Sequence, residues 1–464
     1  MAPLKLYNTL GRKLEEFHPL HDKGVGLYSC GPTVYAPQHI GNMRYFLFVD
    51  VLKRTLTFDG YKVKHVMNIT DVGHLTSNED TGDDKMEASA RRQNKSAREI
   101  ADEIAARFMN DLKSLHIETP DIIPFATKTI DLQIDLIRKL EAKGITYRTS
   151  DGVYFDTSKF PNYGQLSGQK TSDKKSGARV EVNEEKKHPT DFALWKFSKP
   201  EDQRQMEWPS PWGIGFPGWH LECSAMSMKE LGEQFDIHTG GVDHIAVHHE
   251  NEIAQSEAAT GKHPFVKYWL HGEFLVLPGK RMGKSEGNSI TLQDVINKGI
   301  HPLAFRYLCL QAHYRKPLSF TWEALEAASA GLIRLWAILG ELHDTPKVGC
   351  AEFEEKFLSV MNDDLNTSSA LAIMEDLIKS DYPWSAKLQT LAKFDQVLSL
   401  DLNPIKARDH IKPMNPEAEK LLVKYISARH KKQYATSDGL RKKIEALGVI
   451  VEDLPDGTSR LRKK

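Results

Sequence analysis

Residues 24–67 read GVGLYSCGPTVYAPQHIGNMRYFLFVDVLKRTLTFDGYKVKHVM, and the elements that they predict decide the fold. Residues 24–29 are a largely apolar run that ends at Gly31-Pro32, which is typical of a buried strand. The next segment has apolar residues at helical spacing and a closing glycine: Phe46, Val49, Leu52, Leu56 and Gly60. Residues 62–70 then predict a second strand. A strand, a helix and a strand in this order form a βαβ unit, so we expect a parallel sheet.

Outward from this unit, the sequence predicts three parts. Apolar periodicity predicts helices near 97–115, 127–143, 321–400 and 417–445. We expect an α/β domain over 1–320 with an insertion at about 115–210, a helical bundle over 321–400, and a linker with a small basic module over 401–464. The linker is expected at 401–416 because three prolines lie there. An acidic, turn-rich insertion occupies residues 77–87.

The bulk composition limits the classes of protein that fit. The 464 residues carry a net charge of -1, so no global positive field attracts nucleic acid, and any such binding needs local patches. The four cysteines are widely spaced, which is typical of a reducing compartment and not of a disulfide framework. We see neither a signal peptide nor an apolar run long enough for a membrane span. We expect a cytoplasmic monomer.

The tetrapeptide His39-Ile40-Gly41-Asn42 opens the predicted helix. A helix N-terminus presents unpaired N–H groups and a partial positive charge, which suit a phosphate. Gly41 lets the backbone approach closely, and His39 can donate to a phosphate oxygen. The alternative is that His39 only caps the helix and Gly41 only serves packing.

A second candidate phosphate-binding motif is the basic stretch Lys280-Arg281-Met282-Gly283-Lys284-Ser285. Cations on a glycine-flanked loop can close over a triphosphate and neutralise the charge that develops on transfer. The alternative is a solvated basic turn.

A third group has the chemistry of metal ligands. His248 and Glu252 are four residues apart in an apparently helical segment, so they share one face. Cys30 ends the first strand, and Cys223 lies in Trp219-His220-Leu221-Glu222-Cys223-Ser224. Two thiolates, an imidazole and a carboxylate suit tetrahedral zinc. Their spacing alone equally fits two core cysteines and a charged helix face.

The tetrapeptide His39 through Asn42 and the stretch Lys280 through Ser285 together resemble the HIGH and KMSKS signatures of class I aminoacyl-tRNA synthetases, which bind ATP on a Rossmann-like fold. Other stretches are similar to motifs of the cysteinyl-tRNA synthetase family and follow the family order. They are Gly31 through Tyr35, Asn68 through Asp71, Trp195-Lys196, Pro217 through Met226, Phe235 through His238 and His248 through Gln255. The similarity extends from Leu6 to Asp453.

The resemblance implies a Rossmann-like catalytic domain with a KMSKS-like loop at 278–288, a helical domain and a C-terminal anticodon-binding module. Its implied zinc ligands are Cys30, Cys223, His248 and Glu252. It implies ATP, with Mg²⁺, at His39, Gly41, Arg281, Lys284 and Ser285, and catalysis by His39, Asn42 and Lys284. It implies a cysteine pocket at Cys30, Gly31, Thr70, Trp219 and His238.

Some positions depart from the family pattern. Asn42 replaces the second histidine of HIGH, and Arg281 and Gly283 replace a lysine and a serine of KMSKS. Asn42 can still donate a hydrogen bond, and Arg281 keeps its charge. Thr239 replaces an expected glycine.

The implied activity is that of a cysteine–tRNA ligase, whose partners are L-cysteine, ATP and tRNA(Cys). Zinc would select the substrate thiolate. Three alternatives stay open: a cysteine ligase of thiol-cofactor synthesis that shares the catalytic core, a non-catalytic tRNA-binding paralogue, and a zinc hydrolase with Glu250 as its base. The basic chain end favours the synthetase over the first of these.

Overall fold

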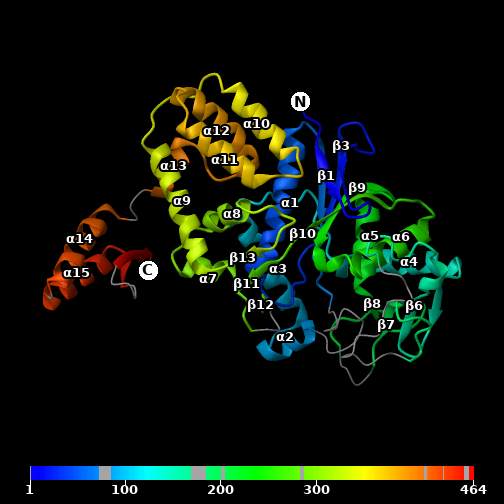
Figure 1. The fold of residues 1–464 in the computed structure, drawn as a ribbon. Helices are drawn as coiled ribbons and strands as arrows, with labels where there is room; N and C mark the ends of the chain where they lie inside the picture. The colour runs from blue at the N-terminus through cyan, green and yellow to red at the C-terminus, as the bar shows by residue number, and fades with distance from the viewer. Residues whose placement is uncertain are drawn as a thin grey trace.

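A computed structural model describes residues 2–72, 85–168, 184–199, 204–278, 280–282, 287–411, 415–431, 433–453 and 459–463. A four-stranded parallel sheet lies at its centre, in the order β10-β9-β3-β4 (Figure 1). Its strands are β3 (Gly24–Ser29), β4 (Lys62–Met67), β9 (Phe235–Gly241) and β10 (Val266–Gly272). All neighbouring pairs are parallel, so the prediction of an α/β fold with a parallel sheet is confirmed.

The helix that joins β3 to β4 is α1 (Ile40–Phe58). It begins at an N-cap, His39, and ends before Gly60, which has a positive φ of 88°. Apolar side chains from most of its turns are buried against the sheet and the helices around it: Ile40, Met43, Leu47, Leu52 and Leu56. This burial holds the first turn of α1 at the carboxyl ends of the strands, where ligands bind in open α/β sheets.

Two further helices belong to the parallel unit. The first, α5 (Trp219–Leu231), precedes β9, and the second, α6 (His248–Thr260), joins β9 to β10. The two helices pack against each other. An N-terminal hairpin of β1 (Lys5–Asn8) and β2 (Lys13–Glu16) packs beside β10.

An antiparallel sheet lies between β4 and β9 in the sequence, in the region where we expect an insertion. Its strands are β5 (Thr146–Arg148), β6 (Gly152–Phe155), β7 (Phe192–Phe197) and β8 (Gly215–Pro217). The helices before it are α2 (Lys85–Gln93), α3 (Ala97–Ser114) and α4 (Ile130–Ala142). Most of the acidic stretch 77–87 lies outside the described residues.

After β10, a small sheet leads into the helical part. Its strands are β11 (Leu275–Leu277), β12 (Lys280–Arg281) and β13 (Leu318–Ser319). The helices that follow β11 are α7 (Leu292–Asn297), α8 (Pro302–Leu310), α9 (Trp322–Gly340), α10 (Ala351–Met361), α11 (Thr367–Lys379) and α12 (Trp384–Leu398). Arg306 of α8 is fully buried and ties several elements together, because it donates to Leu398 O at 2.7 Å, to Leu115 O at 3.0 Å and to Asp50 Oδ2 at 2.6 Å.

The linker prediction is wrong for part of residues 401–416. Residues Pro404–Ile411 form a helix, α13, which packs against α9. Ala407 is fully buried, and the His410 ring stacks on Trp336 with centroids 4.0 Å apart. Proline is tolerated in the first turn of a helix, so Pro404 here starts a helix and does not mark a loop.

The helix predicted near 417–445 is two helices, α14 (Pro416–His430) and α15 (Tyr434–Ala446), followed by a hairpin of β14 (Val449–Asp453) and β15 (Ser459–Lys463). Their apolar faces meet in a small core of Ala418, Tyr425, Ile444, Val449 and Val451. One continuous helix could not fold back to bury these faces on each other. This unit lies at the left edge of the molecule in Figure 1, away from the parallel sheet.

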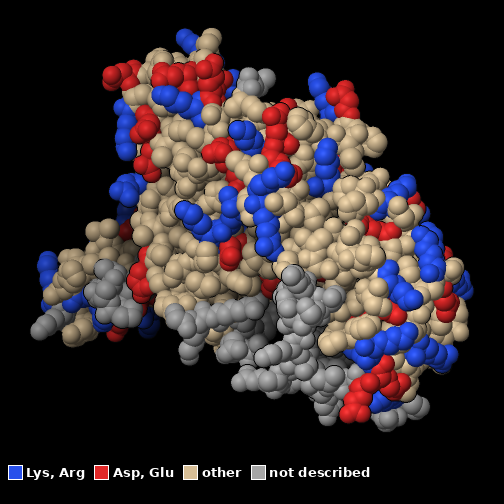
Figure 2. Space-filling view, turned by 45° about the vertical axis from the view of Figure 1, so that its right-hand side comes forward, with Lys and Arg blue, Asp and Glu red and all other residues tan. Residues whose placement is uncertain are grey.

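Charges of both signs are interspersed over most of the face in Figure 2, in line with the net charge of -1. Among the described helices, none is long and apolar enough to cross a membrane.

Candidate functional site

A cavity of about 360 Å³ opens at the carboxyl ends of the parallel strands. Nine of the residues predicted for the site line it: Cys30, Gly31, His39, Gly41, Asn42, Thr70, Trp219, Cys223 and His248. His238 and Glu252 are fully buried beside His248. Lys284 and Ser285 lie outside the described residues, and Arg281 is described only as part of β12.

At one end of the cavity, a buried cluster brings together the four residues with metal-ligand chemistry. Potential ligand atoms of Cys30, Cys223, His248 and Glu252 all lie within 4.8 Å of one another. The α-helical turn between His248 and Glu252 aims both side chains the same way, and His248 Nε2 lies 3.0 Å from Glu252 Oε1. Apart from this ion pair, neither of these two buried atoms has a hydrogen-bond partner among the residues that the structure describes. Buried polar atoms are normally satisfied, so this pair has the chemistry to ligate a cation.

The electrostatics of the cluster follow from burial and mutual contact. Burial raises the pKa of the Cys30 thiol well above its usual range, whereas a hydrogen bond with Cys30 lowers the pKa of Cys223 to about 7. Burial disfavours the charged form of Glu252, but the rings of His238 and His248 outweigh it and lower its pKa to about 2. For His248 burial opposes the charge, and Glu252 together with Cys223 raises its pKa to about 10. The protonation states of these four side chains therefore depend on one another, as is expected of residues that can ligate one cation.

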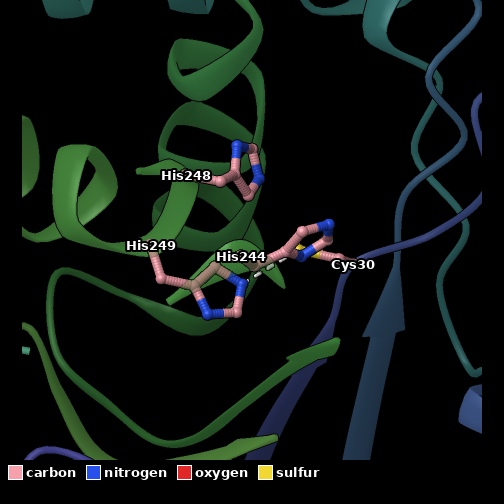
Figure 3. A group of neighbouring side chains, drawn as sticks. All are labelled: Cys30, His244, His248 and His249. Atoms are coloured by element: carbon pink, nitrogen blue, oxygen red, sulfur yellow. Dashed lines mark hydrogen bonds between the residues drawn. The ribbon is translucent and has the colours of Figure 1, made fainter. Parts of the chain in front are cut away.

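Three more histidines surround this cluster, and two of them, His244 and His249, were missed by sequence reasoning. Figure 3 shows Cys30, His244, His248 and His249, which form an overlapping set of potential ligands. Cys30, His238, His249 and Glu252 form another. The signal available in the sequence was the density of histidines, since His244 precedes His248 by four residues and His249 follows it directly.

Their hydrogen bonds distinguish the supporting histidines, His238 and His249, from the candidate metal ligands. Both ring nitrogens of His249 are engaged, with Cys30 Sγ at 3.3 Å and His271 Nε2 at 2.8 Å. Both of His238 are engaged as well, with Glu252 Oε2 at 2.9 Å and Thr239 O at 3.2 Å. The set Cys30, Cys223, His248 and Glu252 therefore matches a metal best, because it leaves these bonds in place.

Next to the cluster, a polar pocket is built from the ends of β3 and β4. Thr70 Oγ1 accepts from Asn68 Nδ2 at 3.0 Å and donates to Glu222 Oε2 at 3.1 Å. A Cβ on Gly31 would meet Asn68 O at 1.6 Å, so only glycine fits there. The Trp219 ring stacks on His248, with centroids 4.1 Å apart, and lines the cavity beside it.

The other end of the cavity is the first turn of α1. His39 Nδ1 accepts from the Asn42 backbone N–H at 3.1 Å, and Asn42 Oδ1 accepts from the His39 N–H at 3.3 Å. His39 is therefore a helix cap, as one alternative held. An accepting Nδ1 requires the neutral tautomer with its proton on Nε2, so the same ring also offers an N–H donor. The capping and donor interpretations are compatible.

The departure at Thr239 is accommodated by α1. The Tyr45 hydroxyl lies 2.9 Å from Thr239 O and 3.0 Å from Thr239 Oγ1. The extra side chain thus has a polar partner.

Comparison with solved structures identifies the class of fold. Mycobacterium tuberculosis methionyl-tRNA synthetase, in complex with methionyl-adenylate, superposes with a TM-score of 0.54 at 14% identity, over 89% of this chain and 96% of that one. At this identity the likeness shows the fold alone. The chain thus has the fold of this tRNA synthetase.

Sequence comparison identifies the family. Residues 16–330 match the family model described as tRNA synthetases class I (C) catalytic domain. The cysteine–tRNA ligase of Treponema denticola is 46% identical over 97% of this chain and 98% of its own length, and cysteine–tRNA ligase 1 of Burkholderia lata is 47% identical over 98% and 96%. The Thermus thermophilus enzyme of the same name is 40% identical over 98% of both. The chain belongs to the cysteine–tRNA ligase family.

Proposed function

We propose that this protein activates L-cysteine with ATP and transfers it to tRNA(Cys), and that zinc held by Cys30, Cys223, His248 and Glu252 selects the substrate by its thiolate. The observation that carries the proposal is the shared cavity. A cluster of soft and borderline ligands lies at one end, and a helix N-terminus suited to phosphate lies at the other.

The residues of the cluster fit zinc. Two thiols, one imidazole and one carboxylate are donor types that tetrahedral zinc takes. In the described part of the chain, the facing atoms of His248 and Glu252 have no hydrogen-bond partner beyond their own ion pair. When bound, zinc supplies a soft Lewis acid that prefers a thiolate to a hydroxyl and lowers the pKa of a bound thiol. A pocket based on size alone would distinguish cysteine from serine or alanine by only about 1–3 kcal/mol.

The residues of this chain then position the reactants. Thr70 and Trp219 line the same cavity and would orient the amino acid. The cysteine carboxylate attacks the α-phosphate of ATP, giving cysteinyl-adenylate and pyrophosphate. A ribose hydroxyl at the tRNA 3′ end then attacks the activated carbonyl, which forms the cysteinyl ester and releases AMP. The Nε2–H of His39 donates to a phosphate oxygen. Lys284 and Mg²⁺, proposed from the sequence, neutralise developing charge.

Glu250 argues against the zinc hydrolase alternative. Its carboxylate accepts from the backbone N–H groups of Gly164 at 2.7 Å, Leu166 at 3.0 Å and Ser167 at 2.8 Å. A carboxylate whose two oxygens accept from three backbone donors anchors a loop and is not left to activate a water. The relatives named above also match over nearly their full length, which supports the synthetase over a ligase with only the catalytic core.

The test is exchange of radioactive pyrophosphate into ATP with cysteine, with serine as control, before and after a chelator removes zinc. We expect exchange with cysteine only, loss on chelation and recovery with added zinc. Exchange that persists without metal would contradict the role of the cluster. A lack of exchange in the zinc-loaded protein would favour a non-catalytic paralogue.

A further inference from the structure

A buried arginine one turn into α1 contacts four backbone carbonyls. Arg44 is 4% exposed, and it donates to Glu273 O at 3.0 Å, Phe274 O at 2.5 Å, His313 O at 3.3 Å and Lys316 O at 2.5 Å. Among the described residues, no carboxylate forms an ion pair with its guanidinium. Burying a cation that only donates to carbonyls costs desolvation free energy. We therefore expect the contacts of Arg44 to have a structural role other than an ion pair.

The carbonyls that Arg44 holds belong to the cavity wall. Glu273 and Phe274 line the cavity together with Leu275, the first residue of β11. A second attachment lies nearby, because the Ile40 N–H donates to Ile290 O at 2.7 Å and His39 pairs with Thr291 as an isolated bridge. The residues just before β11 and the residues at Ile290 and Thr291 are therefore both attached to the start of α1.

We infer that Arg44 is a positioning residue for the nucleotide end of the site: it fixes the wall at Glu273–Leu275 relative to the phosphate-facing turn at His39. The inference rests on the proposed function, since it assigns ATP to that end of the cavity. A displacement of about 1 Å in a reacting arrangement can cost about 100-fold in rate. Arg44 thus acts through the wall and does not itself touch ATP.

Lysine cannot replace Arg44 in this role. A guanidinium presents five N–H donors in a planar fork and reaches carbonyls on both of its terminal nitrogens, as seen here, whereas an ammonium offers three donors from one atom. Arg44→Lys retains the charge and loses the fork. Arg44→Ala removes both and leaves a space that free guanidinium can enter.

The experiment compares Arg44→Lys and Arg44→Ala with Arg306→Lys, which changes a buried arginine remote from the cavity. Steady-state exchange gives the KM for ATP and the KM for cysteine separately. Bound zinc and the unfolding temperature are measured on the same preparations. We expect kcat/KM for ATP to fall about 100-fold in Arg44→Lys, with the KM for cysteine and bound zinc unchanged. Millimolar guanidinium should partly restore Arg44→Ala, and Arg306→Lys should lose stability while keeping its ATP kinetics.

Three outcomes would overturn the inference. Arg44→Lys could keep wild-type ATP kinetics, or it could lose ATP and cysteine kinetics equally with a drop in unfolding temperature like that of Arg306→Lys. If neither Arg44 variant folds, Arg44 is a folding residue only. Absence of exchange in the unaltered, zinc-loaded protein would instead refute the proposed function, so the two failures are distinguishable.

Discussion

Replacement of Cys223 by serine should lower the affinity for zinc by more than about 100-fold, which exceeds the usual effect of losing a residue that only supports a ligand. Cys223→Ser keeps the shape of the side chain and exchanges a soft sulfur for a hard oxygen. It also leaves Cys30 without the partner that lies within 4.8 Å of it. Cysteine-dependent pyrophosphate exchange should fall to background at micromolar zinc. Competition with a chromophoric chelator measures the affinity directly.

The matched control is Cys309→Ser, since Cys309 is also a buried thiol but lies in α8, outside the cluster. It should keep both zinc and exchange, although burying a hydroxyl there costs some stability. If Cys223→Ser bound zinc as tightly as the unaltered protein, the ligand set would have to include His244 or His249 instead. That result would favour one of the overlapping sets around Cys30.

Replacement of His39 by asparagine should lower kcat for exchange by about 100-fold, the cost of removing one donor to a developing negative charge. Asparagine is among the best N-cap residues, so the first turn of α1 should persist. It does not reproduce the Nε2–H of the histidine ring, whose Nδ1 accepts from the Asn42 N–H. Measurement of kcat and of the unfolding temperature in the same preparation separates the two roles.

His301 supplies the control for capping, because its Nδ1 accepts from the Leu303 N–H at 3.2 Å at the start of α8. His301→Asn exchanges one cap for another away from the cavity and should leave exchange unchanged. If His39→Asn retained full activity as well, His39 would be a cap and nothing more.

The parallel sheet could be predicted because residues 24–67 contain a complete βαβ unit in which periodicity, turn residues and element order agree. The C-terminal part could not be predicted, because proline occurs both in linkers and in the first turn of helices. Pro404 is compatible with a linker and with the first turn of a helix, and only packing of α13 on α9 decides between them. The break between α14 and α15 likewise depends on a core that sequence periodicity does not reveal.

Within the site, local spacing predicted which residues share a face and could not predict what they face. Helical spacing correctly paired His248 with Glu252, whose side chains lie 3.0 Å apart. Their neighbours point elsewhere: His249 contacts Cys30 and His271, and Glu250 anchors the loop at Gly164. These contacts join segments far apart in the sequence, so they needed the structure.

Substitution by Co²⁺ tests most directly whether the metal recognises the sulfur of the substrate. Cobalt in a site with thiolate ligands has absorption bands that respond to each added sulfur. Titration of the Co²⁺-loaded protein with cysteine should change these bands in a saturable way, and serine should leave them unchanged. If the spectrum stayed constant while cysteine supported pyrophosphate exchange, the metal would be structural and cysteine would be selected elsewhere.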